Sequence, residues 1–250
     1  MTLVWLDGAL IPAGEARIDP ADRGFLLSDG VFETLCHRGD RIHRLAAHLA
    51  RLRDGCRILG IPLDRTDDAL ADGLAAVAQA PFAQGGGCSL RLTVTAGVGR
   101  RGLLRSPGMR PTVLITAAPL PAPPGPARLI IATVTRRNEH SPLSRVKSLN
   151  YLDGILAREE AAARGADDAV LLNTAGRVAE ATAANLFLEI DCTWVTPPVS
   201  EGALPGTMRA AMIVAWGAVE RPVTVADLHR ADRIVLTNAL GLRDVAGIQA

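Results

Sequence analysis

The residues best suited to chemistry lie close together in the stretch SRVKSLNYLDG, residues 144–154. Lys147 is the only lysine among the 27 lysine and arginine residues, and Tyr151 is the only tyrosine. A lysine that loses its proton can attack a carbonyl carbon and form a Schiff base, whereas the arginine guanidinium keeps its charge. This difference makes Lys147 a candidate nucleophile. The alternative is a surface lysine retained by chance.

The position of Lys147 favours a functional role. The sequence predicts a loop that enters a helix of about residues 150–164, with Ser148 and Asn150 as candidate caps. Helix N-termini favour anions over cations, so a lysine at this place contributes little to stability. A lysine poorly placed for stability is a better candidate for chemistry.

Glu180 lies in GRVAEATAANLF, just beyond a predicted hairpin turn. A carboxylate at this place could face a pyridine nitrogen and keep it protonated, so that the ring could accept electrons. The alternative is an ordinary exposed glutamate on a strand.

Two further features could bind a phosphate. Pro205 and Gly206 lead into a predicted helix, whose first backbone N–H groups, at Thr207 and Met208, could hold an anion. Arg51 follows His48 by one turn on another predicted helix and could bind a phosphate through two hydrogen bonds. The alternative is that the arginines of that helix only form its solvent-exposed face.

The segment GVGRRG, residues 97–102, matches the glycine pattern of dinucleotide-binding loops. That interpretation requires a helix next and an acidic residue about twenty positions later. Two prolines follow instead, and no Asp or Glu occurs between Gly102 and Glu139. We therefore reject the dinucleotide site. The loop, with Arg100 and Arg101, could bind a substrate carboxylate or be only a solvated connection.

The composition excludes several classes of protein. Hydrophobic residues make up 48% of the chain, enough for a sizeable core, and the net charge of +1 argues against nucleic acid as a partner. The four cysteines lie far apart, without the spacing of a metal site, as is typical of thiols in a reducing compartment. No signal peptide or membrane-spanning run is apparent, so we expect a cytoplasmic protein.

Periodicity predicts an N-terminal α+β domain over residues 1–118. Its expected elements are a hairpin over 3–13, a turn at Asp29-Gly30, helices over 42–59 and 67–80, and strands over 88–97 and 111–120. The stretch 119–127 contains five prolines and one glycine, which is typical of an exposed linker.

A C-terminal α/β domain is expected over residues 128–250, and it would carry Lys147. Its expected elements are a strand over 128–135, the helix over 150–164, two strands around an Asn-Thr-Ala-Gly turn, a strand over 193–198, a helix from about 207, and strands over 219–225 and 233–238.

Taken in order, these segments resemble the class IV aminotransferase family, the fold-type IV enzymes that use pyridoxal 5′-phosphate. The matching segments span most of the chain: DRGFLLSDGVFETL, HLARL, VKSLNYL, GADDAVLLNTAGRVAEATAANLF, TPP and LPGTMR. The resemblance implies a two-domain, D-amino acid aminotransferase-like fold of α+β and α/β domains with the cofactor between them. It also implies a homodimer, with residues from both chains near each site, that acts on a small amino substrate.

The resemblance also implies roles for individual residues. Lys147 would be the catalytic Schiff-base lysine and the proton shuttle, and Glu180 would be the partner of the pyridine nitrogen. Tyr151 would contact the oxygen on the cofactor ring. The other implied cofactor contacts are Arg51, Asn185, Thr207, Met208 and Asn238, with Thr237 as an alternative to Asn238, and the substrate contacts are Phe32, Arg100 and Arg101. No metal is implied.

The resemblance leaves the reaction open. The segment GRRGL is similar to GGRGY of the 4-amino-4-deoxychorismate lyases, and the short chain suits them. D-amino acid aminotransferases, and usually the lyases too, have an arginine where Ala96 stands, and the Arg-Pro pair of branched-chain aminotransferases is missing from this strand. We favour the lyase, which releases pyruvate and 4-aminobenzoate for folate synthesis. The alternatives are a branched-chain or D-amino acid aminotransferase and, more remotely, a non-catalytic paralogue that binds pyridoxal phosphate.

Overall fold

The computed structural model describes residues 2–79 and 87–249, and their contacts divide the chain into two compact units. The first unit contains residues 1–121 and 147–150, and the second contains residues 122–146 and 151–250. The division after residue 121 falls within the proline-rich stretch. The contacts group residues 147–150 with the first unit, whereas the sequence analysis places them in the second domain.

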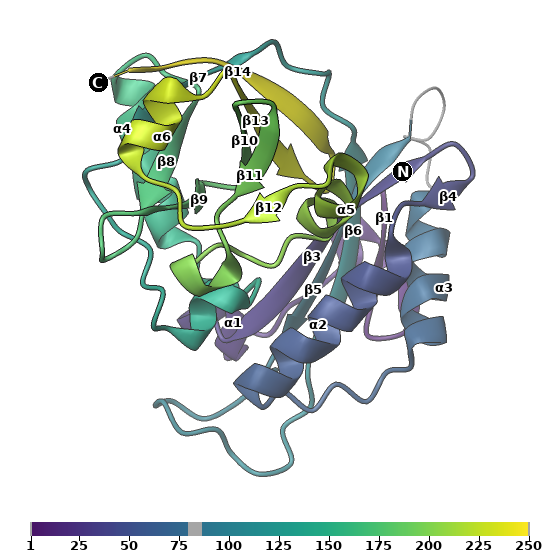
Figure 1. The fold of residues 1–250 in the computed structure, drawn as a ribbon. Coiled ribbons are helices and arrows are strands. Elements are labelled where there is room, and N and C mark those ends of the chain that lie inside the picture. The colour runs from purple at the N-terminus through teal and green to yellow at the C-terminus, as the bar shows by residue number, and fades with distance from the viewer. Residues whose placement is uncertain (1, 80–86, 250) are drawn as a thin grey trace. The chain divides into compact units, whose positions relative to one another are not determined.

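The first unit is built on a six-stranded antiparallel sheet with the strand order β2-β1-β6-β5-β3-β4 (Figure 1). The strands are β1 (Leu3–Leu6), β2 (Ala9–Pro12), β3 (Gly30–Arg38), β4 (Arg41–Ile42), β5 (Cys88–Thr95) and β6 (Val113–Pro119). The helices are α1 (Arg23–Leu27), α2 (Leu45–Leu59) and α3 (Asp67–Ala78). Helix α2 packs against β3, and α3 packs against β1, β5 and β6.

Alternating side chains explain how this sheet is buried. Along β5, Cys88, Leu90, Leu92 and Val94 are buried and the residues between them are more exposed, so one face of the strand meets the helices. Helix α3 begins where Thr66 accepts a hydrogen bond from the N–H of Ala69 at 3.2 Å. These elements form as the sequence predicts, with two exceptions. The expected helix over 42–59 begins only at Leu45, because Ile42 pairs with His37 as part of β4, and Ala80, the last residue of the expected second helix, lies outside the described residues.

The second unit is built on an eight-stranded mixed sheet with the strand order β12-β11-β10-β13-β14-β7-β8-β9 (Figure 1). The strands are β7 (Ala127–Ile131), β8 (Asp168–Leu172), β9 (Val178–Ala181), β10 (Asn185–Ile190), β11 (Thr193–Thr196), β12 (Val219–Glu220), β13 (Arg233–Asn238) and β14 (Gly241–Gln249). The helices are α4 (Leu152–Ala163), α5 (Thr207–Trp216) and α6 (Val225–Arg230). Aliphatic side chains from these strands fill a core that includes Leu129, Val170, Leu186 and Leu188.

Three elements differ from the sequence-based expectation. Helix α1 was not expected, and it begins where the Asp22 side chain accepts from the N–H of Gly24 at 2.7 Å. The expected strand over 219–225 ends at residue 220, and α6 follows because Thr224 and Asp227 form a reciprocal capping box. Strand β14 was also missed, and it joins β13 to β7. The hairpin around Asn-Thr-Ala-Gly contains β8 and β9, with β10 as a separate third strand.

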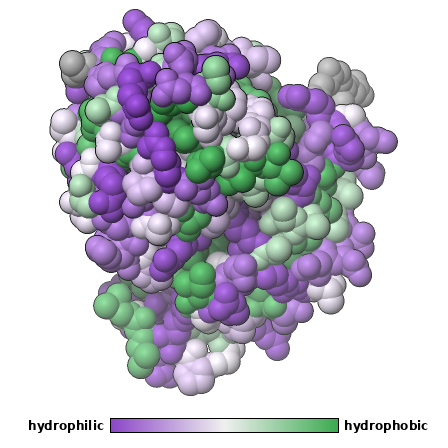
Figure 2. Space-filling model, viewed as in Figure 1, coloured by the Kyte–Doolittle hydropathy of each residue, from purple (hydrophilic) through white to green (hydrophobic). Residues whose placement is uncertain are grey.

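The surface mixes charged and apolar residues. Hydrophilic and hydrophobic side chains are interspersed over the face shown in Figure 2. Among the described residues, no helix is both long and apolar enough to span a membrane.

Candidate functional site

Lys147 lies in an extended segment that pairs with β3. The N–H of Phe32 donates to the Lys147 carbonyl at 2.9 Å, and the N–H of Leu149 donates to the Gly30 carbonyl at 2.9 Å. A Cβ atom at Gly30 would lie 2.5 Å from the Val94 carbonyl oxygen, so only glycine allows this close approach. The expected caps, Ser148 and Asn150, are therefore wrong. Helix α4 begins later, with Tyr151 as its N-cap, because this segment uses its backbone groups to pair with β3.

The amine of Lys147 lies over the Phe32 ring. Its Nζ is 4.3 Å from the ring centroid, and the guanidinium carbon of Arg91 is 3.7 Å from the same centroid. The two cationic groups are therefore at most 8.0 Å apart. Phe32 is 6% exposed, and its ring holds both cations by cation–π attraction. An amine and a guanidinium on one ring could together receive a substrate that carries both a carbonyl or amino group and a carboxylate.

Arg51 projects from α2 toward β3 and is held by the buried carboxylate of Glu33. Arg51 Nε donates to Glu33 Oε1 at 2.8 Å, and Arg51 Nη2 donates to Glu33 Oε2 at 2.6 Å. His48 Nδ1 lies 2.7 Å from Glu33 Oε2. Burial alone would raise the pKa of Glu33, but the hydrogen bonds of Arg51 and His48 hold this pKa below its ordinary value. The carboxylate is therefore ionised at neutral pH.

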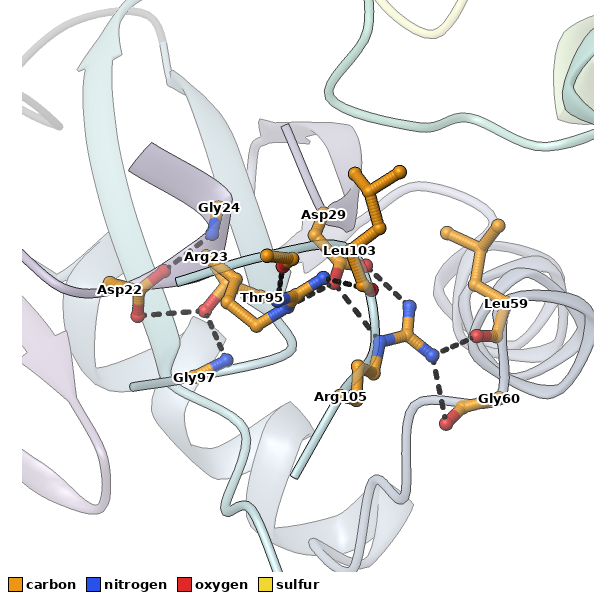
Figure 3. Close-up of polar contacts among 11 residues, drawn as sticks. Asp22, Arg23, Gly24, Asp29, Leu59, Gly60, Thr95, Gly97, Leu103 and Arg105 are labelled. Carbon is orange, nitrogen blue, oxygen red and sulfur yellow. Dashed lines mark hydrogen bonds and ion pairs between the residues drawn. The ribbon is translucent and has the colours of Figure 1, made fainter. Parts of the chain in front are cut away.

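A second carboxylate, Asp29, fixes the loop that follows β5 (Figure 3). It accepts from Arg23 Nε at 2.7 Å and from Arg105 Nε at 3.0 Å, and the pKa of Asp29 is lowered chiefly by its hydrogen bonds with Arg105. Arg23 also donates to the carbonyls of Gly102 and Leu103 at 2.8 and 2.9 Å. The backbone beside Arg100 and Arg101 is thus anchored, although both arginine side chains are exposed.

Over residues 97–112, all of which the structure describes, no helix follows GVGRRG, as the rejection of a dinucleotide site requires.

Glu180 lies on β9 in the second unit and is 8% exposed. Its Oε1 is 3.0 Å from Arg137 Nη2, and its Oε2 accepts from the Leu204 N–H at 2.9 Å. Asn185 Nδ2 lies 3.5 Å from the same Oε2 and donates more closely, at 2.9 Å, to the Leu204 carbonyl. These donors stabilise an ionised, oriented carboxylate, which is the form that a pyridine N–H would need as a partner.

The N-terminus of α5 has the form of an anion site. Gly206 is the N-cap and supplies no side-chain cap, and Thr207 is the first helical residue. A Cβ atom at Gly206 would lie 2.1 Å from Asn185 Oδ1, so this position cannot carry a capping side chain without displacing Asn185. Backbone N–H groups at such a terminus favour a phosphate. Met208 follows in the first turn and is half-buried.

Thr237 and Asn238 differ in their surroundings at the end of β13. Thr237 is 1% exposed, and its hydroxyl has no hydrogen-bond partner among the described residues. Asn238 is exposed, and its Oδ1 accepts from the N–H of Leu240 at 2.9 Å. A buried hydroxyl without a partner is costly unless a ligand satisfies it. Thr237 lies on β13, against which α5 packs. Its hydroxyl is therefore a better candidate for a phosphate contact than the Asn238 side chain, which already accepts from Leu240.

Sequence reasoning missed three residues of this arrangement. Glu33 and Arg137 hold two predicted site residues, and Arg91 shares the Phe32 ring with Lys147. The signal for Arg91 was the strand period: it lies two residues from Thr93, the cross-strand partner of Phe32, and so on the same face of the sheet. Glu33 and Arg137 had no comparable signal, because no strand register relates Glu33 to Arg51 on α2 or Arg137 to Glu180 on β9.

Among the described residues, no group of three or more His, Cys, Asp or Glu side chains could hold a metal.

Comparisons with known proteins give a consistent result. Residues 30–248 match the family described as "Amino-transferase class IV". A protein of Methanocaldococcus jannaschii, named provisionally as a branched-chain-amino-acid aminotransferase, is 32% identical over 94% of this chain and 83% of its own.

Two solved structures are also similar. The 4-amino-4-deoxychorismate lyase from Pseudomonas aeruginosa is 34% identical, with a TM-score of 0.85 over 99% of this chain and 92% of that one. A branched-chain amino acid aminotransferase from a source abbreviated T.th., complexed with N-(5′-phosphopyridoxyl)-L-glutamate, is 25% identical, with a TM-score of 0.89 over 98% and 85% of the two chains.

Proposed function

The chain belongs to the class IV aminotransferase family, and from that premise we propose that it is a pyridoxal 5′-phosphate enzyme acting on an amino substrate that carries a carboxylate. The observation that carries this proposal is the placement of the Lys147 amine and the Arg91 guanidinium over one Phe32 ring. The cofactor assignment is supported by the phosphopyridoxyl adduct in the branched-chain aminotransferase structure. It is also supported by the N-terminus of α5, which has no side-chain cap, and by the buried Thr237 hydroxyl.

When bound, pyridoxal phosphate supplies an aldehyde that condenses with amines and a ring that accepts electrons from the substrate α-carbon. Lys147 would provide the amine that anchors it and would move a proton to or from the reacting carbon. Glu180, which Arg137 and the Leu204 N–H hold in place, would keep the ring nitrogen protonated. Arg51, Thr207 and Thr237 would bind the phosphate, and Tyr151 would contact the ring oxygen.

Within the family, we favour 4-amino-4-deoxychorismate lyase, which splits its substrate into pyruvate and 4-aminobenzoate. The substrate of this reaction carries two carboxylates. Figure 3 shows the contacts of Asp29 that anchor the loop. The exposed Arg100 and Arg101 of this loop, and Arg91 at Phe32, could bind the two carboxylates. The 34% identity to the Pseudomonas lyase supports the same choice.

An amino-acid aminotransferase is the second candidate. It is favoured by the 32% identity to the Methanocaldococcus relative, and it uses the same cofactor contacts. The third candidate, a paralogue that binds the cofactor without turnover, is disfavoured by the orientation of Glu180 through its pair with Arg137, which such a protein would not need.

The experiment that separates these candidates supplies aminodeoxychorismate in one assay and an amino acid with 2-oxoglutarate in another. Pyruvate and 4-aminobenzoate from the first assay would establish the lyase, and glutamate from the second would establish the aminotransferase. Protein that is yellow but inactive in both assays would favour the third candidate.

We further propose a homodimer in the cytoplasm. The large apolar side chains of Phe25, Leu103 and Leu104, which are 74%, 85% and 89% exposed on the first unit, support an association surface. Four cysteines without a disulfide support a reducing compartment. Light scattering of the purified protein tests the dimer, and a monomeric mass would refute it.

A further inference from the structure

Glu33 is a buried carboxylate that serves none of the roles assigned so far. Its side chain is 1% exposed, and it lies on β3 directly after Phe32. A buried charge is costly unless it is paired and hydrogen-bonded, and both of its oxygens have partners on α2. The pairing with Arg51 uses two parallel N–H donors, Nε and Nη2, at 2.8 and 2.6 Å.

This two-point contact fixes the plane of the Arg51 guanidinium. One hydrogen bond would let the group rotate about the contact, whereas two parallel bonds to a rigid carboxylate define both its position and its orientation. His48, whose side chain is wholly buried, contacts Glu33 Oε2 at 2.7 Å and limits the movement of the carboxylate. The Nη1 side of Arg51 is therefore held pointing away from Glu33.

We propose that Glu33 is a positioning residue for the cofactor phosphate, acting through Arg51. This inference rests on the proposed function, in which Arg51 binds the phosphate. Glu33 does not touch the phosphate itself. It aligns the guanidinium so that the N–H groups on the side away from Glu33 meet the phosphate oxygens without further loss of side-chain freedom on binding.

The proposal predicts the opposite sign from simple charge. Removing the negative charge of Glu33 raises the net positive charge beside the phosphate, so charge alone predicts tighter phosphate binding in Glu33→Gln. Positioning predicts weaker binding, because glutamine has one acceptor oxygen and must turn its amide N–H₂ toward one of the two Arg51 donors. The sign of the change therefore decides between the two explanations.

The test compares pyridoxal 5′-phosphate with pyridoxal, which lacks the phosphate. Dissociation constants are measured by visible absorbance on cofactor-depleted full-length protein for the wild type, Glu33→Gln, Arg51→Lys and the double variant. We expect the wild type to prefer the phosphorylated ligand, with the preference expressed as the ratio of the pyridoxal to the pyridoxal 5′-phosphate dissociation constant. In Glu33→Gln this ratio should fall about tenfold, while the affinity for pyridoxal itself should change less than about twofold. The double variant should lose little more than either single variant.

Glu33→Asp, measured in the same way, keeps the buried charge but has a shorter side chain that cannot keep both contacts with Arg51, so it tests the positioning even if Glu33→Gln does not fold. Asp227→Asn is the matched control. Asp227 is a buried carboxylate that pairs with Arg230 on α6 and with Arg221, which precedes this helix. The substitution should lower the melting temperature without changing the preference.

Two outcomes overturn different claims. A wild type that binds both ligands equally would contradict the phosphate role of Arg51 within the proposed function. A wild type that prefers the phosphate, with the preference kept or increased in Glu33→Gln or kept in Glu33→Asp, would overturn the inference about Glu33 alone. A preference kept in Arg51→Lys would contradict the phosphate role of Arg51. Additive losses in the double variant would overturn it as well.

Discussion

The Glu180→Gln substitution tests whether this carboxylate has a chemical role beyond its part in the fold. Glu180 accepts from the Leu204 N–H at 2.9 Å and pairs with Arg137 Nη2 at 3.0 Å. Glutamine has a single acceptor oxygen, so its N–H₂ group must face one of these donors. The lost charge-assisted hydrogen bond costs about 2 kcal/mol, which lowers the melting temperature of a chain of this size by roughly 4–8 °C.

The expected catalytic effect is much larger than this change in stability. A neutral amide cannot hold a proton on the ring nitrogen, so we expect kcat to fall about a hundredfold or more, with the cofactor still attached to the lysine. Calorimetry and steady-state turnover of the favoured substrate measure the two effects separately.

Asp227→Asn provides the matched control for Glu180→Gln. Asp227 has a carboxylate of similar burial, paired with Arg221 and Arg230, and it should lose comparable stability without losing kcat. If Glu180→Gln retained kcat within about threefold of the wild type, or if the control lost as much activity, the assignment of Glu180 would be refuted.

Three further predictions follow from single contacts. Thr237→Val should not lower the melting temperature of the cofactor-depleted protein, because its buried hydroxyl has no partner among the described residues, yet it should weaken pyridoxal 5′-phosphate binding about tenfold; unchanged affinity would contradict the phosphate role. Asp29→Asn should destabilise the protein at neutral pH by breaking the pair with Arg105. The fold lowers the pKa of Asp29 from its ordinary value of 3.8. The difference in unfolding free energy between variant and wild type should therefore be constant above about pH 4 and shrink as the pH falls further. Denaturant titrations that show the same difference at every pH would contradict this. Cys192, which is exposed, should react with a thiol reagent at about pH 8, whereas Cys56, whose pKa burial raises to about 11, should react only after unfolding; equal rates would contradict the placement of Cys56.

Local pattern was sufficient to predict most elements and to nominate candidate site residues, whose roles stay predictions. The alternation in β5 and the helical period of α2 and α3 arise from one buried face each, which is visible in a single stretch of sequence. Lys147 was identified because an amine can do chemistry that arginine cannot, and its uniqueness made it visible. Glu180 was identified from its place after a hairpin that the structure contains.

Contacts between distant segments could not be predicted in the same way. The grouping of Lys147 with the first unit depends on hydrogen bonds to Gly30 and Phe32, which lie far earlier in the chain. The pairing of Glu33 with Arg51 depends on how α2 packs against β3. Strand β14 forms by pairing with β13 and β7. Its own side chains are exposed or half-buried, so its sequence does not mark a buried face. Each of these features is a property of tertiary packing.

The most direct measurement of the central claim is borohydride reduction of the cofactor-loaded protein followed by peptide mass spectrometry. Lys147 is the only lysine, so the side chains offer a single amine for a stable pyridoxyl adduct. The account predicts loss of the visible absorbance band and one pyridoxyl group on Lys147, with neither band nor adduct in Lys147→Arg. An unmodified Lys147 peptide, or a Lys147→Arg variant that retains turnover, would contradict it.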